Sequence, residues 1–214
     1  MMTVMCLNPY RFCINIMNEH LYWTFGYGSI VNLDTWSHPV AYKPAYLDGW
    51  KRSWRHVVHL DCGSFSALTL EPCPNTRIAG LLVATDQVNS EILNNREIGY
   101  ELMNINDAHL SLTDSDTDHT GDARGYTSRQ SHIQTPDNMA PIQQSYLDCV
   151  MQGYYNVFGE SGVIDFMETT DFWDAPILLD RDNPSYPRPI ELTKPQLDLF
   201  TQLTDAKQLT YINK

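Results

Sequence analysis

Apolar and polar positions along the chain favour strands in the first two thirds and helices in the last third. The aromatic run 22–25 is β-prone and leads into a glycine turn at 26–29. The run 77–84 is continuously apolar, as in a strand that is buried on both faces. The predicted strands, separated by Gly, Pro and Asn, are 22–25, 55–60, 66–70, 77–84 and 100–105.

Helices are predicted from apolar spacing together with signals at their ends. Asp86 can serve as the N-cap of a short helix whose pattern breaks near Gly99. Thr193 and Gln196 form a capping box that opens the last helix. Two more helices are predicted, over 141–153 with a proline at its start, and from 163 to near 173. Strands first and helices later predict an α+β domain of about five to seven strands.

The expected organisation is an N-terminal extension over 1–20 followed by a single domain over 21–214. Within that domain, 107–140 is polar and rich in turn residues. A loop of this length is uncommon in a compact domain, so we expect a mobile flap or a partial hairpin, with one hairpin strand over 124–133.

Composition narrows the classes of protein and partner. The chain has 214 residues, of which 43% are hydrophobic and 19% charged, which excludes disorder as the global state. Twenty-six acidic residues against 14 basic ones give a net charge of −12, which argues against a nucleic-acid or anionic-membrane partner. No apolar run reaches the roughly 18 to 20 residues of a membrane span.

Five cysteines, an odd number with no CxxC pair, suggest neither a disulfide framework nor a thiolate zinc site. We therefore expect a cytoplasmic protein. The histidines have no spacing typical of metal ligands, and we expect no metal site.

The first chemical candidate is the turn Phe25-Gly26-Tyr27-Gly28-Ser29-Ile30. A strand that ends in such a turn exposes consecutive backbone N–H groups, which can bind a carboxylate or an oxyanion. The alternative is an ordinary tight turn. Ser29 lacks the flanking glycines of a nucleophile elbow, so a hydrolase that uses Ser29 is the weakest hypothesis.

The second candidate is Glu97, in the segment 93–100. A carboxylate at the C-terminal end of a helix meets the negative end of the helix dipole, which raises its pKa. This suits a general base if Glu97 also faces a cleft. The alternatives are a solvated residue at the helix end, or an ion pair with Arg96 or another base.

The third candidate is the segment 46–55, where Lys51, Arg52 and Arg55 place three of the 14 basic residues within five positions. Aromatic residues alternate with these bases. The segment is either an anion-recognition edge or a strand whose aromatic side chains face the core while its cations face water.

In order along the chain, these segments resemble the γ-glutamylcyclotransferase superfamily. Residues 27–30 resemble the family's YGSL turn, with Ile30 in place of leucine, and 47–54 resembles the strand that follows in ChaC-type branches. Residues 93–100 resemble the segment that supplies the catalytic glutamate, here Glu97. The sequence 141–147, with a later glycine, resembles a helix found late in bacterial relatives. The resemblance spans about residues 22–190.

The resemblance implies a fold and a reaction. The fold would be a small, closed or nearly closed mixed β-barrel with helices packed outside. The reaction would be intramolecular attack by the α-amine of a γ-glutamyl compound on its own γ-carbonyl, which releases 5-oxoproline and an amine without a cofactor. Glu97 would be the general acid and base, and Tyr27, Gly28, Ser29 and Ile30 would hold the substrate.

Two further residues are assigned to the substrate site by the resemblance. Tyr100 could orient Glu97, and Arg52 could either anchor substrate or support the fold. The alternative function is a non-catalytic module on the same fold, which binds a small carboxylate or a protein partner. Neither the γ-glutamyl donor nor the oligomeric state can be deduced from the sequence. The 107–140 loop has no clear counterpart in the smallest family members. A loop near the mouth of the site would shape the side that holds the leaving group, so the resemblance does not identify the leaving group.

Overall fold

The computed structural model describes residues 21–36, 39, 41–113, 122–135 and 139–214, so the predicted N-terminal extension lies outside the described residues. The strands are β1 (Tyr22–Gly26), β2 (Ala41–Leu60), β3 (Gly63–Thr85), β4 (Tyr100–Ile105), β5 (Leu110–Leu112), β6 (Ala123–Ser128), β7 (Ile142–Gln143), β8 (Thr170–Asp171), β9 (Ile177–Leu179) and β10 (Tyr211–Asn213). The helices are α1 (Gln87–Arg96), α2 (Gln144–Glu168) and α3 (Lys194–Ala206). Short 3-10 turns are η1 (Ser29–Val31), η2 (Leu33–Thr35), η3 (Asp107–His109) and η4 (Gln130–His132).

All ten described strands belong to one mixed sheet. Its main path runs β10-β9-β7-β3-β1-β6-β4, and β2 pairs with β3, β5 and β8. Antiparallel pairs join β1 to β3 and β4 to β6, whereas β1 and β6 are parallel. Five strands have five or more residues, within the expected range, and the other five are pairings of two or three residues. The α+β class is thus confirmed. The pairings among the described residues form no closed ring, so barrel closure stays a prediction.

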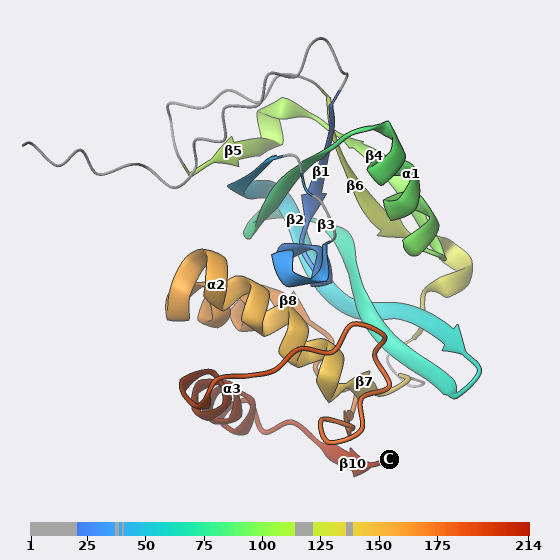
Figure 1. Ribbon diagram of the computed structural model, residues 1–214, viewed down its shortest axis with the longest axis vertical. Helices are drawn as coiled ribbons and strands as arrows, with labels where there is room; N and C mark the ends of the chain where they lie inside the picture. The colour runs from blue at the N-terminus through green and yellow to red at the C-terminus, as the bar shows by residue number, and fades with distance from the viewer. Residues whose placement is uncertain (1–20, 37–38, 40, 114–121, 136–138) are drawn as a thin grey trace, which may run out of the picture.

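A long hairpin of β2 and β3 dominates the sheet and extends well beyond its neighbours (Figure 1). The sequence predicts separate strands at 66–70 and 77–84, but the structure joins them. The Pro and Asn punctuation between them forms a bulge, because Trp50 pairs with Pro72 while Asp48 pairs with Arg77. Asn75 accordingly has a positive φ of 70°. The pattern located the irregularity correctly, but it could not show that pairing with β2 continues past it.

The helices begin close to where their end signals predict. The Asp86 side chain accepts a hydrogen bond from the Asn89 N–H at the start of α1, and the Thr193 capping box opens α3. The sequence predicts that one helix ends at Gly153 and the next begins near residue 163, but α2 continues past Gly153, and its non-helical residue is Gly159, with φ 71°. Two other limits differ from the prediction. Residues 142–143 form β7 before α2 begins, and α2 ends at Glu168 because Thr170–Asp171 leave the helix to pair with β2.

The described part of the polar loop contains two strands. β6 overlaps the strand predicted over 124–133. Its partners are β4 and β1, which precede the loop, rather than a second strand within the loop. Residues 114–121 and 136–138 lie outside the described residues.

The core lies between the sheet and α2. α2 packs against η1 and β3 on one side and against α3 on the other (Figure 1). Its Gly153 allows a close approach, because a Cβ there would lie 2.6 Å from the backbone nitrogen of Asn32. α2 therefore fixes the position of the 27–32 segment. Among the described residues, no helix has both the length and the apolar composition needed to cross a membrane.

Candidate functional site

The turn at 26–30 leaves several backbone N–H groups without acceptors. β1 ends at Gly26, where a Cβ would lie 2.7 Å from the Cβ of Ile30, so the tight turn needs glycine. Tyr27 and Ile30 are buried and anchor the turn. Among the described residues, the N–H groups of Gly28, Ser29 and Ile30 donate no hydrogen bond. The turn therefore has the unpaired donors expected of an anion-binding site.

Glu97 caps the C-terminal end of α1, as the sequence predicts. Its N–H donates to the carbonyl of Leu93 at 3.1 Å, and its side chain is only 15% exposed. Burial raises the pKa of Glu97, and the positive charges of Arg96 and Arg188 offset part of that rise. The main cause of the raised pKa is thus the loss of contact with water, rather than the helix dipole that the sequence position suggests.

Arg96 links Glu97 to the turn. Its Nε lies 3.2 Å from a carboxylate oxygen of Glu97, and its Nη2 donates to the hydroxyl of Ser29 at 2.9 Å. The ion pair between Glu97 and Arg96, which the sequence analysis gives as an alternative to a catalytic role, is therefore present. It does not remove Glu97 from the site, because both residues line a cavity.

Two adjoining cavities meet at Glu97. The inner one, of about 20 Å³, is lined by the turn 27–30 together with Leu68, Glu97, Tyr100, Tyr126 and Tyr146. The outer one has a volume of about 200 Å³. The residues common to both linings are Ser29, Glu97, Tyr100 and Tyr146. Six of the predicted site residues, namely Tyr27, Gly28, Ser29, Ile30, Glu97 and Tyr100, are thus brought together around one space.

Tyr100 forms part of the wall, but it does not bond Glu97. Its hydroxyl donates to the carbonyl of Leu68 at 2.7 Å, and its ring stacks on His56 with centroids 3.8 Å apart. The suggestion that Tyr100 orients Glu97 is therefore not supported by a direct hydrogen bond.

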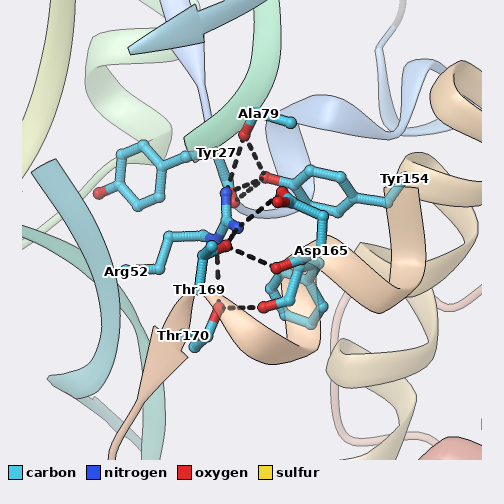
Figure 2. Close-up of polar contacts among 8 residues, drawn as sticks. Tyr27, Arg52, Ala79, Tyr154, Asp165, Thr169 and Thr170 are labelled. Carbon is cyan, nitrogen blue, oxygen red and sulfur yellow. Dashed lines mark hydrogen bonds and ion pairs between the residues drawn. The ribbon is translucent and has the colours of Figure 1, made fainter. Parts of the chain in front are cut away.

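Arg52 lies outside both cavity linings, in a separate polar cluster (Figure 2). It is 0% exposed, and its Nη1 donates to the carbonyl of Ala79 at 2.8 Å and to the Tyr154 hydroxyl at 3.0 Å. Thr169 and Thr170 accept from its other nitrogens. Tyr154 in turn donates to the carbonyl of Tyr27 at 2.9 Å. The sequence left two roles open for Arg52, substrate anchoring and support of the fold. Its position favours support of the fold, because Tyr154 connects it to the backbone of the turn.

Most residues that line the outer cavity were not predicted as site residues, including four polar ones from the last third of the chain. These are Gln143, Tyr146, Tyr186 and Arg188. Tyr186 and Arg188 lie on the connection from β9 to α3, which Figure 1 shows running back across α2 towards the β2–β3 hairpin. No local signal distinguished these residues, although Arg188 is one of only 14 bases.

Among the described residues, the Ser29 hydroxyl is not hydrogen-bonded to a carboxylate or a histidine. The bond to its hydroxyl in the described structure comes from Arg96, a cation that cannot accept a proton. This geometry argues against Ser29 as a hydrolytic nucleophile. The described residues also contain no group of three His, Cys, Asp or Glu side chains placed to hold a metal ion.

Comparisons with known proteins bear on the fold. No family model matches the sequence, and no curated protein does so. A solved structure described as a gamma-glutamyl cyclotransferase matches with a TM-score of 0.54 at 12% identity, covering 86% of this chain and 99% of its own. A crystal structure of an uncharacterised human protein matches with the same four values.

The chain has the γ-glutamylcyclotransferase fold. This confirms the structural part of the resemblance drawn from 27–30, 47–54 and 93–100. At 12% identity the match identifies the fold alone. The activity must therefore be argued from the site itself.

Proposed function

We propose that this protein is a γ-glutamylcyclotransferase, which releases 5-oxoproline from a γ-glutamyl peptide or amine. The observation that carries the proposal is the inner cavity, where Glu97, a buried carboxylate, lines the same small space as Gly28, Ser29 and Ile30, whose backbone N–H groups have no acceptor among the described residues. A base and an oxyanion-binding turn are the two elements that this cyclisation requires.

The substrate supplies its own nucleophile. Glu97 takes one proton from the α-ammonium group, and the freed amine attacks the γ-carbonyl carbon. A new C–N bond closes the five-membered lactam, Glu97 returns the proton to the departing nitrogen, and the original amide C–N bond breaks. The attacking nitrogen then loses its second proton through Glu97 to the released amine, which leaves as an ammonium group. The atoms balance without water, an oxidant or a metal, so the proposal includes no cofactor.

The raised pKa of Glu97 suits this role. A carboxylate with an ordinary pKa is too weak a base to take a proton readily from an ammonium group. A raised pKa brings the carboxyl group closer to the pKa of the ammonium group and makes this transfer easier. Burial both raises the pKa and keeps water from the reacting groups. Holding the flexible chain folded, with amine and carbonyl in contact, removes a further part of the barrier.

The turn binds the negative charge in this scheme. The N–H groups of Gly28, Ser29 and Ile30 hold the α-carboxylate or the developing oxyanion, and Tyr27 and Tyr100 form the cavity wall. Arg52 positions the turn through Tyr154 and does not touch substrate. A cytoplasmic location belongs to the same proposal, and the three described cysteines, Cys62, Cys73 and Cys149, are all free thiols.

The test is a release assay on a panel of γ-glutamyl compounds, with 5-oxoproline followed by mass spectrometry. The panel includes γ-glutamyl amino acids, γ-glutamyl amines and glutathione. We expect 5-oxoproline and the free amine in equal amounts from at least one donor. Saturable binding of these donors in calorimetry without any 5-oxoproline would instead establish the non-catalytic binding module.

A further inference from the structure

Two segments that line the outer cavity are far apart in the chain, yet one buried carboxylate bonds to both. The first segment, 143–146, leads into α2, and the second is part of residues 180–193 between β9 and α3, which we call the strap. We infer that Asp180 is a positioning residue of this cavity, because it holds the strap against the start of α2. Where activity is the readout, the inference rests on the function proposed above.

The strap has few backbone contacts with which to hold itself in place. It contains no helix or strand, and three of its residues are prolines, which have no N–H to donate, namely Pro184, Pro187 and Pro189. It nevertheless brings Tyr186, which is 6% exposed, and Arg188 to the cavity. The conformation of the strap therefore depends on side chains.

Asp180 is the most buried of these side chains, at 1% exposure, and it accepts three hydrogen bonds. Its Oδ1 accepts from the N–H of Ser145 at 2.8 Å. Its Oδ2 accepts from the hydroxyl of Ser145 at 2.8 Å and from the N–H of Ser185 at 2.9 Å. All three partners are donors, so a carboxylate satisfies them. An amide in its place would turn an NH₂ group towards at least one donor.

These bonds supply the cap that the start of α2 lacks locally. The N-cap residue, Gln143, forms no side-chain hydrogen bond to the helix. Asp180 instead accepts from the Ser145 N–H in the first turn, as an N-cap side chain would, and a carboxylate is favoured at this end of a helix. Asp180 thereby fixes the start of α2, where Gln143 and Tyr146 line the cavity.

The hydroxyl of Ser145 extends the link to the strap side of the cavity. It donates to Asp180 and accepts from the N–H of Tyr186 at 3.4 Å. The Tyr186 ring lies 5.0 Å from the ring of Tyr146, and its hydroxyl accepts from Nε of Arg188 at 3.1 Å. Asp180 does not line the cavity itself, so it acts on the cavity through these contacts.

The residue next to Asp180 provides a matched comparison. Arg181 donates to the carboxylate of Asp148 through Nε at 2.7 Å and Nη2 at 2.9 Å, about one turn further along α2. This ion pair also ties the strap to α2, but neither residue lines the outer cavity. Asp148→Asn therefore weakens a strap contact without touching the bonds of Asp180, and it is the control variant.

The first measurement is amide hydrogen exchange of the ligand-free wild-type protein, followed by NMR. The N–H groups of Ser185 and Tyr186 donate to Asp180 and Ser145, both of which are buried. We expect these two amides to exchange about 100-fold or more slowly than unprotected amides. Exchange of both at the unprotected rate would overturn the inference, whether or not any variant folds.

The second measurement uses Ser145→Ala, which removes the hydroxyl but keeps the N–H that caps α2. We expect the amides of 185–186 to exchange about 10-fold faster than in the wild type. KM for the fastest donor of the release panel should rise about 10-fold, with kcat per folded molecule changed less than about threefold, because the cavity wall binds the donor whereas Glu97 lies at the end of α1. Ser145→Thr, which keeps a hydroxyl, should restore most of the wild-type KM. Asp180→Asn should shift exchange and KM further than Ser145→Ala.

The control and the outcomes separate positioning from general support of the fold. Asp148→Asn should lower the folded fraction while KM and the exchange at 185–186 stay within about threefold of the wild type. If Ser145→Ala and Asp180→Asn behave like this control, the inference is overturned and the cyclotransferase stands. If the wild type releases 5-oxoproline from no donor, the proposed function fails, and the exchange at 185–186 still decides the inference.

Discussion

Arg52 and Glu97 are both buried charges from conspicuous sequence segments, yet their surroundings are opposite. Arg52 is fully buried, and its donors have acceptors in Ala79, Tyr154, Thr169 and Thr170 (Figure 2). Glu97 borders a cavity and lies next to backbone donors that have no acceptor. Donors that already have acceptors are not available to a ligand, whereas unpaired donors at a cavity are. The cluster around Arg52 is not fully paired, because Asp165 Oδ2, 3.8 Å from Arg52 Nη2, has no hydrogen-bond partner among the described residues. The difference separates a charge that supports the fold from one that is a candidate for function.

The largest effect on stability should come from Arg52→Met. The variant leaves the Ala79 carbonyl and the Tyr154 hydroxyl partly unpaired in a dry site, so we expect unfolding free energy to fall by about 3–5 kcal/mol. Urea denaturation measures this. The control Arg77→Met, on an exposed ion pair, should cost no more than about 1 kcal/mol. Comparable losses in the two variants would contradict a structural role for Arg52.

A smaller loss of stability is expected from Gly153→Ala. The new methyl group would meet the backbone of Asn32, which cannot move aside as a side chain can, so α2 must shift away from the turn. We expect a loss of about 1–3 kcal/mol and slower 5-oxoproline release from the protein that remains folded. Glu160→Ala, at an exposed position of the same helix, is the control. A variant with wild-type stability and rate would show that the turn does not depend on this contact.

The smallest effect is the pH dependence of stability. Because burial raises the pKa of Glu97 above 4.5, the folded state binds its proton more tightly than the unfolded state. The carboxyl group therefore stabilises the protein less as pH rises from 4.5 through the raised pKa, and above that pKa it is a constant penalty. Glu97→Gln should thus raise Tm at pH 7, and the gain should vanish near pH ~4. A Tm at pH 7 below that of the wild type would contradict the raised pKa. Arg52→Met should show no such pH-dependent gain.

Features encoded within a few residues could be predicted from the sequence. The caps at Asp86 and Thr193 and the helix end at Glu97 all depend on neighbours one turn away. The turn at 26–30 was also recognisable, because two glycines follow an aromatic strand. These local signals sufficed for the α+β class and for locating the 26–30 turn and Glu97, whose chemical roles stay proposals.

Features that depend on distant pairing could not be predicted. Arg52 and its acceptor Thr170 are 118 residues apart, so sequence alone left the role of Arg52 open. Gln143 and Arg188 reach the cavity only because β7 joins the sheet and the segment before α3 folds back. Strands of two residues, such as β7 and β8, have no hydrophobic period to detect.

The most direct measurement is the initial rate of 5-oxoproline release by Glu97→Gln on the best donor of the panel, divided by the folded fraction. The substitution keeps the size of the side chain and removes the base. The account predicts a loss of about 10²- to 10⁴-fold relative to the wild type. A rate within threefold of the wild-type rate would show that Glu97 is not the base and would contradict the proposed mechanism.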